Sequence, residues 1–449
     1  YDGAGRAEEA FLWSAPATDS ETYAVSRATG AAIVNLFDDA DVDRYAGSGD
    51  NHVTYVSRGD WEGTWPAQRL ELSIATDTMA EDISSNKPLP DAGEDLPVYG
   101  ADNGLTLAAL RSSEENPVPY DDERWELLLD QMTLEEQMAL VTTGQFSTLA
   151  VQSIGKPATA ENDGPTGLAN TTTGTSFPSE GIWASSWNPA VMELVGDALA
   201  EDALAAGITG LYAGGVNIHR TPFDGRSHEY FSEDPLLSGV AIEHEVIGMQ
   251  KKGVVAHVKH LAFNEEETNR NGIGVWLCEQ EAREILLVPF EYALSEDLGG
   301  AGAVMTSFNR IGLIWAGAHS GLLGDLIHGE WGFHGYNITD MASSNGAYYM
   351  TAQDGVLAGT DLYLAAGEDI SALAANPVFA GKLRDACHHI LYTVVNKSAA
   401  MNGLGVETIV STVTPWWQTA LRAALVLTGA LTACAACLYG VSWRKQTRA

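Results

Sequence analysis

The chain has 449 residues and a formal net charge of −36, from 60 acidic and 24 basic side chains. Phosphate binding requires a basic surface, so this composition argues against nucleic acid as a partner and suits a solvated protein that handles neutral ligands. The length exceeds what one small domain needs and accommodates a barrel of about 250 residues with accessory parts.

Residues 1–115 are predicted to be an irregular junction region. Short apolar pieces at 31–37 and 52–57 lie among Asp, Gly and Ser, and residues 84–102 are polar and rich in Pro and Gly, which is typical of a loop or domain boundary. The chain starts at Tyr1 without a charged and apolar leader. We therefore expect it to begin inside a longer protein, with residues 1–115 as a linker or the tail of an upstream domain.

Residues 116–397 are predicted to form a TIM-like α/β barrel. Apolar residues at helical spacing over 121–140 predict two helices, the second starting at Thr133, where TLEE is a capping-box pattern. Between residues 154 and 364, apolar β-branched runs alternate with helical patterns, which indicates repeated βα units and a parallel sheet. The expected strands cover 210–217, 253–260, 302–308, 335–340 and 356–363, and the expected helices cover 189–206, 235–252 and 279–294.

Charged and polar side chains follow these strands. The carboxyl ends of barrel strands meet at one face, which carries the active site, and Asp340 ends the 335–340 strand. The other candidates are Asp163 in ENDGPTGL, Arg226 and Glu229 in GRSHEYFSEDP, Lys259 and His260 at a strand end, Asn264, Glu267 and Arg270 in the next loop, and Asn309 with Arg310. Such a set, without a glycine-rich phosphate loop, suits the hydroxyls of a sugar.

Each of these motifs also has a structural explanation. Asp340 can cap a helix that begins at Met341, and the SEDP segment can cap the helix after it. Lys259 and His260 can form a salt-bridged structural pair. The residues alone leave these alternatives open.

In combination, the motifs resemble the barrel domain of glycoside hydrolase family 3, the family of β-glucosidases, β-xylosidases and related exo-acting enzymes. The likeness covers residues 132–365 and rests on MTLEEQ, DGPTG, NIHRTPFDGRSHEYFSEDP, KHLAFNEEETNR, AVMTSFNR and GFHGYNITD. It implies a retaining hydrolase of terminal β-linked sugars, with Asp340 as the nucleophile that forms a covalent glycosyl intermediate. It also implies that Asp163, Arg226, Lys259 and His260 bind the sugar, with Glu229, Glu267, Arg270 and Met305 as further substrate-binding residues. No metal or organic cofactor is expected.

The sequence departs from the family pattern in ways that matter for catalysis. Phe308 and Met341 stand where the family commonly has Tyr and Trp, and KHLAFNEEETNR differs from the KHFPGHG-type segment that supplies an acid from a histidine loop. In the glucosidase-like branch the acid/base is a Glu of a second, α/β sandwich domain, and we recognise no such domain here. The segments AAIVNLFDDAD and VTYVSRGDWEGTWP are similar to the junction in members with swapped domain order. We therefore expect an α/β sandwich domain upstream or in trans to supply the acid/base.

Two other functions are alternatives to the hydrolase. A membrane-tethered carbohydrate-binding barrel without full catalytic machinery fits the missing acid, Phe308 and Met341, but does not need the Asp340 nucleophile. A Schiff-base enzyme that uses Lys259 is disfavoured, because a lysine beside so many carboxylates stays protonated.

The C-terminus is predicted to be a single membrane span. After a linker over 398–422, residues 423–443 carry no charge, aromatic residues lie at both ends, and Arg444, Lys445 and Arg448 follow. About 20 such residues cross a bilayer, and the basic tail over 444–449 is expected in the cytoplasm. The barrel would then be extracellular at the cell membrane. The alternative is a buried helix of a soluble domain.

Four cysteines are too few for a disulfide framework. Cys434 and Cys437 lie in the expected span, and the spacing of Cys278 and Cys387 fits no zinc pattern. One bridge between Cys278 and Cys387 is compatible with an oxidising compartment.

Overall fold

The computed structural model describes residues 24–45, 77–91, 95–113, 115–169, 171, 173–342, 347–365, 367–409 and 416–446. The chain divides into two compact units, Tyr1–Thr408 and Ile409–Ala449. The apolar piece at 52–57 and the junction motif at 53–66 lie outside the described residues.

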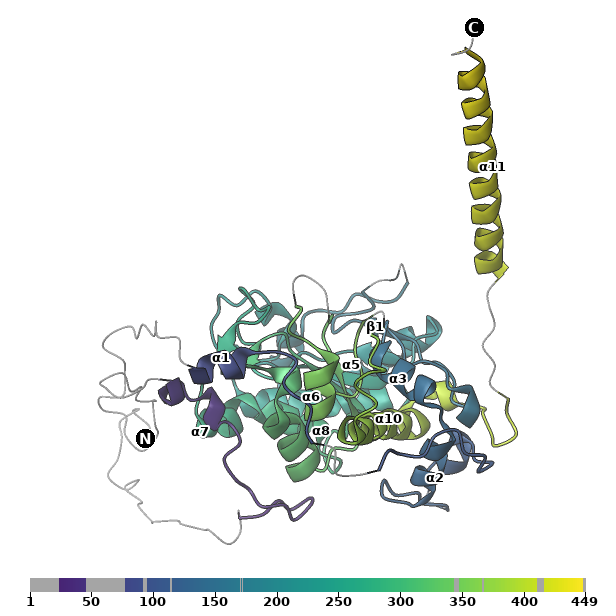
Figure 1. Ribbon diagram of the computed structural model, residues 1–449. Coiled ribbons are helices and arrows are strands. Elements are labelled where there is room, and N and C mark those ends of the chain that lie inside the picture. The colour runs from purple at the N-terminus through teal and green to yellow at the C-terminus, as the bar shows by residue number, and fades with distance from the viewer. Residues whose placement is uncertain are drawn as a thin grey trace, which may run out of the picture. The chain divides into compact units, whose positions relative to one another are not determined.

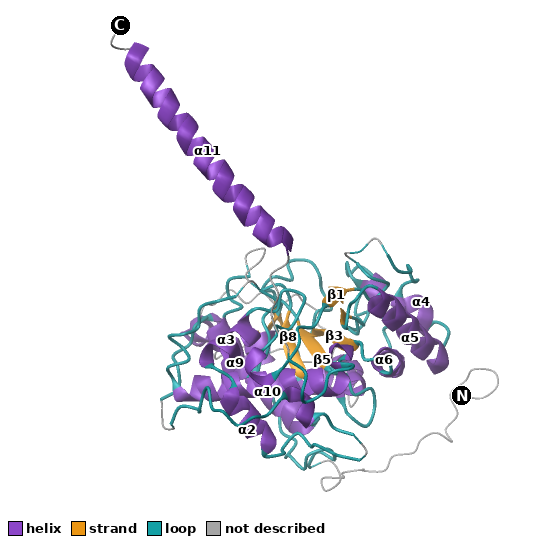
Figure 2. Cartoon of the chain, turned by 90° about the vertical axis from the view of Figure 1, so that its right-hand side faces the viewer, coloured by secondary structure: helices purple, strands orange, loops and turns teal. Residues whose placement is uncertain are grey.

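The first unit is built around a parallel sheet of five strands in the order β1-β2-β3-β5-β8. Figure 2 shows β3, β5 and β8 side by side with helices around them. Their side chains are almost all buried, as expected for parallel strands covered by helices. The strands are β1 (Glu161–Asp163), β2 (Gly210–Tyr212), β3 (Val255–Leu261), β5 (Ala303–Thr306) and β8 (Tyr336–Thr339).

Short extended segments join β8 back to β1. Leu362 forms a parallel bridge to Ile338 of β8. The N–H of Tyr363 donates to the carbonyl of Val141, and the N–H of Gly144 donates to the carbonyl of Tyr363, both at 2.8 Å. The N–H of Glu161 in β1 donates to the carbonyl of Phe146 at 2.8 Å. These bonds complete the ring as in a TIM-like barrel, although the predicted strand over 356–363 is reduced to this one bridge.

The predicted strand over 356–363 is therefore wrong in its first half. Helix α9 (Ala352–Ala358) occupies it, because Thr351 caps this helix by accepting a hydrogen bond from the N–H of Asp354. A short apolar run does not by itself distinguish a strand from a helix.

Three long helices begin with the same local signal, an Asn or Asp cap followed by Pro. Asn188 caps α5 (Pro189–Ala205), Asp234 caps α6 (Pro235–Gln250), and Asn376 caps α10 (Pro377–Lys397). Each cap oxygen accepts a free N–H of the first turn, and Pro at the first helical position has no N–H to satisfy. Helices α5 and α6 pack together and α6 packs on α8 (Val288–Leu294), as Figure 1 shows. Helix α10 packs on α3 (Leu134–Thr142), α9 and β8.

The other helices are short. The expected capping box is present, with Thr133 and Glu136 exchanging hydrogen bonds at the start of α3 (Leu134–Thr142), after α2 (Arg124–Gln131). The predicted helix over 279–294 is divided into α7 (Glu279–Glu281), a π-helix (Ala282–Leu286) and α8 (Val288–Leu294), which has Pro289 in its first turn. The remaining helices of the described first unit are α1 (Asp77–Ile83), α4 (Glu180–Ala184), a π-helix at Gly321–Glu330 and 3-10 turns at Asp38–Ala40, Val42–Tyr45, Leu107–Leu110, Gln152–Ile154, Ser227–Glu229, Ala316–Ala318 and Ala399–Met401.

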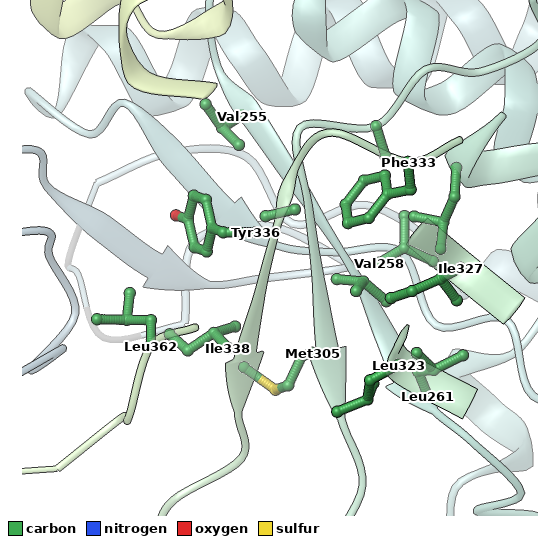
Figure 3. Packing of buried hydrophobic residues seen from close by; sticks show 14 of the residues in the cluster. Val255, Val258, Leu261, Met305, Leu323, Ile327, Phe333, Tyr336, Ile338 and Leu362 are labelled. Atoms are coloured by element: carbon green, nitrogen blue, oxygen red, sulfur yellow. The ribbon is translucent and has the colours of Figure 1, made fainter. Parts of the chain in front are cut away.

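The core lies between the sheet and the helices. Figure 3 shows Val258 and Leu261 of β3 beside Leu323 and Ile327 of the second π-helix, and Met305 of β5 next to Ile338 of β8. Burying one such side chain contributes about 1.5–3 kcal/mol. A smaller sheet, β4 (Gly274–Val275), β6 (Arg310–Ile311) and β7 (Ile314–Trp315), lies in the connections.

Residues before and after the predicted barrel also pack on it. Phe37 is buried, with its ring 5.7 Å from that of Phe263, and the N–H groups of Leu36 and Phe37 donate to Glu279 Oε2 at 2.9 and 3.0 Å. Beyond α10, the N–H of Ala399 donates to the carbonyl of Gly253 at 2.7 Å. The first part of the expected 398–422 linker is thus attached to the barrel.

The second unit contains α11 (Trp416–Gln446), which starts earlier and ends later than the expected 423–443 span. Its stretch Trp416–Val441 is long and apolar enough to cross a membrane by length and composition. All four cysteines are free thiols, so the bridge between Cys278 and Cys387 is not formed.

Candidate functional site

Asp340 directly follows β8 at the carboxyl end of the sheet. Its N–H donates to the carbonyl of Thr306 at 3.1 Å, which ties it to the end of β5. Its Oδ1 accepts from the N–H of Met341 at 2.7 Å, and its Oδ2 lies 3.9 Å from Nε2 of His260. Residues 340–342 form a bend and turn, so among the described residues no helix begins at Met341; residues 343–346 lie outside them.

Burial and nearby cations act in opposite directions on Asp340. The side chain is 13% exposed, and burial raises the pKa of its carboxyl above the ordinary range. The N–H of Met341 and the charges of Arg270, Arg226 and Lys259 oppose this rise. The expected effect of Lys259 and Arg226 is therefore present, but burial outweighs it.

His260 and Arg226 meet beside this carboxylate. Arg226 Nη1 lies 3.0 Å from His260 Nε2, and a guanidinium only donates, so Nε2 must carry a lone pair. Burial, followed by the charges of Arg226, Lys259 and Arg270, holds the pKa of His260 well below its usual value. The imidazole is therefore neutral.

Glu229 ends the 3-10 turn that follows Arg226 and orients this arginine, since Arg226 Nε donates to Glu229 Oε1. Burial raises the pKa of Glu229, but the hydrogen bond from Arg226 and the charge of Lys259 outweigh it, and the net pKa lies below the ordinary value. This carboxylate stays ionised at neutral pH.

Lys259 and Asp163 form an ion pair on the other side of the site. Lys259 Nζ lies 3.1 Å from Asp163 Oδ1, and the lysine side chain is 4% exposed whereas that of Asp163 is 43% exposed. Both residues, with Arg226 and Glu229, line a cavity of about 580 Å³ whose other wall is the 164–169 turn. Charged groups that face a cavity of this size can hydrogen-bond a bound hydroxylated ligand.

The loop after β3 adds Glu267 and Arg270. Arg270 Nη1 lies 3.1 Å from Glu267 Oε1, and its guanidinium lies 4.6 Å above the centroid of the Phe308 ring. Phe308 thus supports a cation instead of offering a hydroxyl to Asp340. The hydroxyl of Tyr349 donates to the carbonyl of Phe308 at 2.5 Å, and burial is the main reason that the pKa of Tyr349 rises to about 12.

Buried amides brace the loops that carry these groups. Asn217 accepts from the N–H of His260 at 2.9 Å and donates to its carbonyl at 3.2 Å. Asn309 donates to the carbonyl of Ala262 at 2.9 Å. Arg310 lies 4.5 Å over the ring of Tyr349 and donates to Leu313. The structure thus gives Asn309 and Arg310 bracing contacts.

The two methionines differ in exposure. Met305 is buried in the core, in register with Lys259 of β3 and Ile338 of β8. Met341 is 42% exposed beside Asp340. A direct role for Met305 in substrate binding stays a prediction.

Sequence reasoning missed Tyr349 and Tyr230, which contacts His260. Tyr349 lies in a polar loop without a motif, so no signal points to it. Tyr230 belongs to the GRSHEYFSEDP motif, so the motif itself is the signal that could have pointed to it, but the prediction used only the charged residues of this motif.

A second group of possible metal ligands, His328, Asp361 and His389, has donor atoms within 4.8 Å of one another. The two imidazoles stack, with centroids 4.2 Å apart and an angle of 4° between their planes. Nitrogen lone pairs lie in the ring plane, so in this arrangement they point along parallel planes and do not converge on one ion. His389 Nδ1 instead lies 2.9 Å from Asp361 Oδ1.

The fold and the sequence agree with one family of known proteins. The sequence model of the glycosyl hydrolase family 3 N-terminal domain matches residues 127–391, more than half of the chain. The fold is thus of the TIM-like α/β class. The chain belongs to glycosyl hydrolase family 3.

Several of the matched relatives and solved structures are named β-glucosidases. The chain is 36% identical over 248 residues to Beta-glucosidase B of Emericella nidulans and 35% identical over 242 residues to a beta-glucosidase of Rhizobium radiobacter. These alignments cover 54% and 52% of this chain but only 28% and 29% of the relatives. Beta-glucosidase 3B of Thermotoga neapolitana in complex with α-D-glucose matches with a TM-score of 0.53 and 30% identity, over 62% of this chain and 43% of that one. A β-glucosidase of Paenibacillus barengoltzii has a TM-score of 0.60 and 26% identity, over 70% and 36%.

Proposed function

We propose that this chain is the nucleophile-bearing part of a retaining exo-glycosidase that hydrolyses terminal β-linked sugars. The observation that carries the proposal is the position of Asp340 at the end of β8, with three cations, Arg226, Lys259 and Arg270, acting on its carboxylate. The β-glucosidase relatives support the same class of reaction.

In the proposed reaction, Asp340 attacks the anomeric carbon and forms a glycosyl ester, which water then hydrolyses. Asp163, Lys259, Arg226 and His260 bind the hydroxyls of the sugar, and Glu229, Glu267 and Arg270 keep these groups in place. Hydrogen bonds from cations to hydroxyls strengthen as charge develops in the transition state. A second carboxyl, about 5–5.5 Å from the nucleophile, must protonate the leaving oxygen. We propose that an α/β sandwich domain, upstream or in trans, supplies it.

The test is a trapping assay with activated 2-fluoro β-glycosides of several sugars. Such leaving groups need little acid assistance, so the assay reports the nucleophile without the acid/base. We expect covalent mass on the peptide that contains Asp340, and none in an Asp340→Asn variant of the same fold.

The alternative is a carbohydrate-binding barrel without turnover, which the missing hydroxyl at Phe308 and the exposed Met341 favour. Measurable sugar binding without any label on Asp340 would establish this alternative and reject the hydrolase. Binding is best measured by calorimetry on the same samples.

We further propose that α11 anchors the chain as a single span in the cell membrane, with the barrel outside. Its apolar stretch and the adjacent Arg444 support this orientation. The chain should float with lipid vesicles and resist extraction at high pH, whereas a variant that ends at Ile409 should not.

A further inference from the structure

We propose that Tyr230 is a positioning residue that fixes His260 in its Nδ1–H tautomer, so that Nε2 keeps its lone pair toward Arg226 and Asp340. The proton arrangement around His260 leads to this assignment. Arg226 Nη1, at 3.0 Å, can only donate to Nε2. In a neutral imidazole the proton is then on Nδ1, and this N–H needs an acceptor.

The partner of Nδ1 is the hydroxyl oxygen of Tyr230, at 3.5 Å. Both residues are buried, and Tyr230 is 0% exposed. A buried N–H without an acceptor is costly, so the tyrosine oxygen stabilises the Nδ1–H tautomer that the Arg226 contact also requires.

Tyr230 is itself held from two directions. Asn264 Nδ2 donates to the tyrosine oxygen at 3.1 Å, and the tyrosine hydroxyl lies 3.5 Å from the carbonyl of Asn264, to which it donates. On its backbone side, Tyr230 bridges to Gly215, where a Cβ would come within 2.8 Å of the tyrosine ring. These contacts therefore hold the tyrosine hydroxyl in a fixed position beside His260.

The tautomer matters because Asp340 Oδ2 lies 3.9 Å from the same Nε2. With a lone pair on Nε2, this carboxylate oxygen receives no hydrogen bond from His260 and remains available. With the proton on Nε2, the imidazole would turn a donor toward both the Arg226 guanidinium and Asp340. The carboxylate would then be hydrogen-bonded and less reactive. The charged and titratable groups that act on His260 are Arg226, Lys259, Arg270, Asp340 and Tyr230.

The first experiment is solid-state ¹⁵N NMR of the full chain labelled with ¹⁵N-histidine, with a His260→Gln variant to assign the signals. We expect a protonated Nδ1 and an unprotonated Nε2 for His260 in the wild type, and a shift toward protonated Nε2 in Tyr230→Phe. A wild-type His260 that is protonated on Nε2 overturns the proposal without any variant. An unchanged tautomer in Tyr230→Phe also overturns it.

The second experiment rests on the proposed function and measures the rate of Asp340 labelling against pH. Tyr230→Phe should slow labelling about tenfold with little change in sugar affinity, and its acid limb should move to lower pH because a donor at Nε2 favours ionised Asp340. The matched control is Tyr212→Phe, which removes a buried hydroxyl that donates to Glu161 at 2.8 Å. Equal pH profiles for both variants reject a positioning role. If the wild type is not labelled at all, the proposed function fails, while the NMR result still decides the tautomer.

Discussion

The guanidinium of Arg270 lies 4.6 Å above the ring of Phe308, and its charge acts on Asp340, which directly follows β8. Through this contact the Phe308 ring helps to fix the position of Arg270, one of the cations that favour ionised Asp340. An aromatic ring that faces a guanidinium contributes about 0.5–2 kcal/mol.

Phe308→Leu should therefore release Arg270 and weaken its effect on Asp340. Without a fixed cation the pKa of Asp340 rises further, so the acid limb of the labelling rate should move to higher pH, and the rate at neutral pH should fall by roughly five- to thirtyfold, about 1–2 kcal/mol. Phe308→Tyr keeps the ring beside Arg270 and serves as the control, since its added hydroxyl can only favour ionised Asp340 and should not move the acid limb to higher pH. A Leu variant with wild-type rate and pH limb would show that the ring has no such role.

Lys259 and Asp163 should behave differently although they form one ion pair. The charge of Lys259 also lowers the pKa of Glu229 and Asp340. Lys259→Met should therefore weaken sugar binding and move the acid limb of the labelling rate to higher pH by about one unit. Asp163→Asn should weaken binding without moving the limb, because Asp163 is half exposed and is not among the groups that shift Asp340. Labelling kinetics over pH 4–8 separate the two effects, and equal shifts in both variants would contradict this division.

Glu245 of α6 should make the fold less stable as pH rises. It is 0% exposed, its oxygens have no hydrogen-bond partner among the described residues, and burial raises its pKa to about 8. The unfolded chain has lost this proton above its ordinary pKa near 4.5, so between the two values unfolding releases a proton and the free energy of unfolding falls with pH.

The free energy of unfolding, measured with urea, should thus fall between pH 5 and 8 by up to about 1.4 kcal/mol per pH unit because of this group. Glu245→Gln should flatten that slope. Glu243→Gln, on the same helix but only partly buried, should leave it unchanged. Parallel slopes in all three proteins would mean that Glu245 is ionised in the native state.

The capping box at the start of α3 offers a test of local stability. Thr133 Oγ1 accepts from the N–H of Glu136 at 3.1 Å, and Glu136 Oε2 accepts from the N–H of Thr133 at 3.0 Å. Thr133→Ala should lower the free energy of unfolding by about 1 kcal/mol, whereas Thr133→Ser should retain most of it. Chemical denaturation of both variants gives the comparison, and an Ala variant as stable as the Ser variant would rule out the cap's contribution.

The sequence correctly predicted the helices whose starts are set by neighbouring residues in the chain. The helices over 189–206 and 235–252 match α5 and α6 within two residues, because an Asx–Pro start and a long apolar pattern leave little choice. The region over 279–294 was expected to be one helix, and the π-turn before Pro289 that divides it has no clear sequence signal. The apolar composition of the 356–363 segment predicts a strand, but Thr351 caps a helix that covers its first residues.

The motifs also predicted much of the candidate site, but not its proton arrangement. Asp163, Arg226, Glu229, Lys259, His260, Glu267, Arg270 and Asp340 follow or belong to neighbouring strands and loops, as the strand-end argument requires. The neutral state of His260 depends on which nitrogen meets Arg226, and the contact between Tyr349 and Phe308 joins loops far apart in the chain. Such relations arise only when the barrel brings the strand ends together.

The hydrogen bonds of Tyr363 to Val141 and Gly144 have a consequence for how the protein is made. They join the extended segment at Tyr363 to the end of α3 and to Gly144, so the ring cannot close until residue 363 has left the ribosome. Closing so long a loop is entropically expensive and slow. Helices α5 and α6 are neighbours in the sequence, so they can pack together much earlier during synthesis. The hydrogen bonds of Tyr363 to Val141 and Gly144 can form only later.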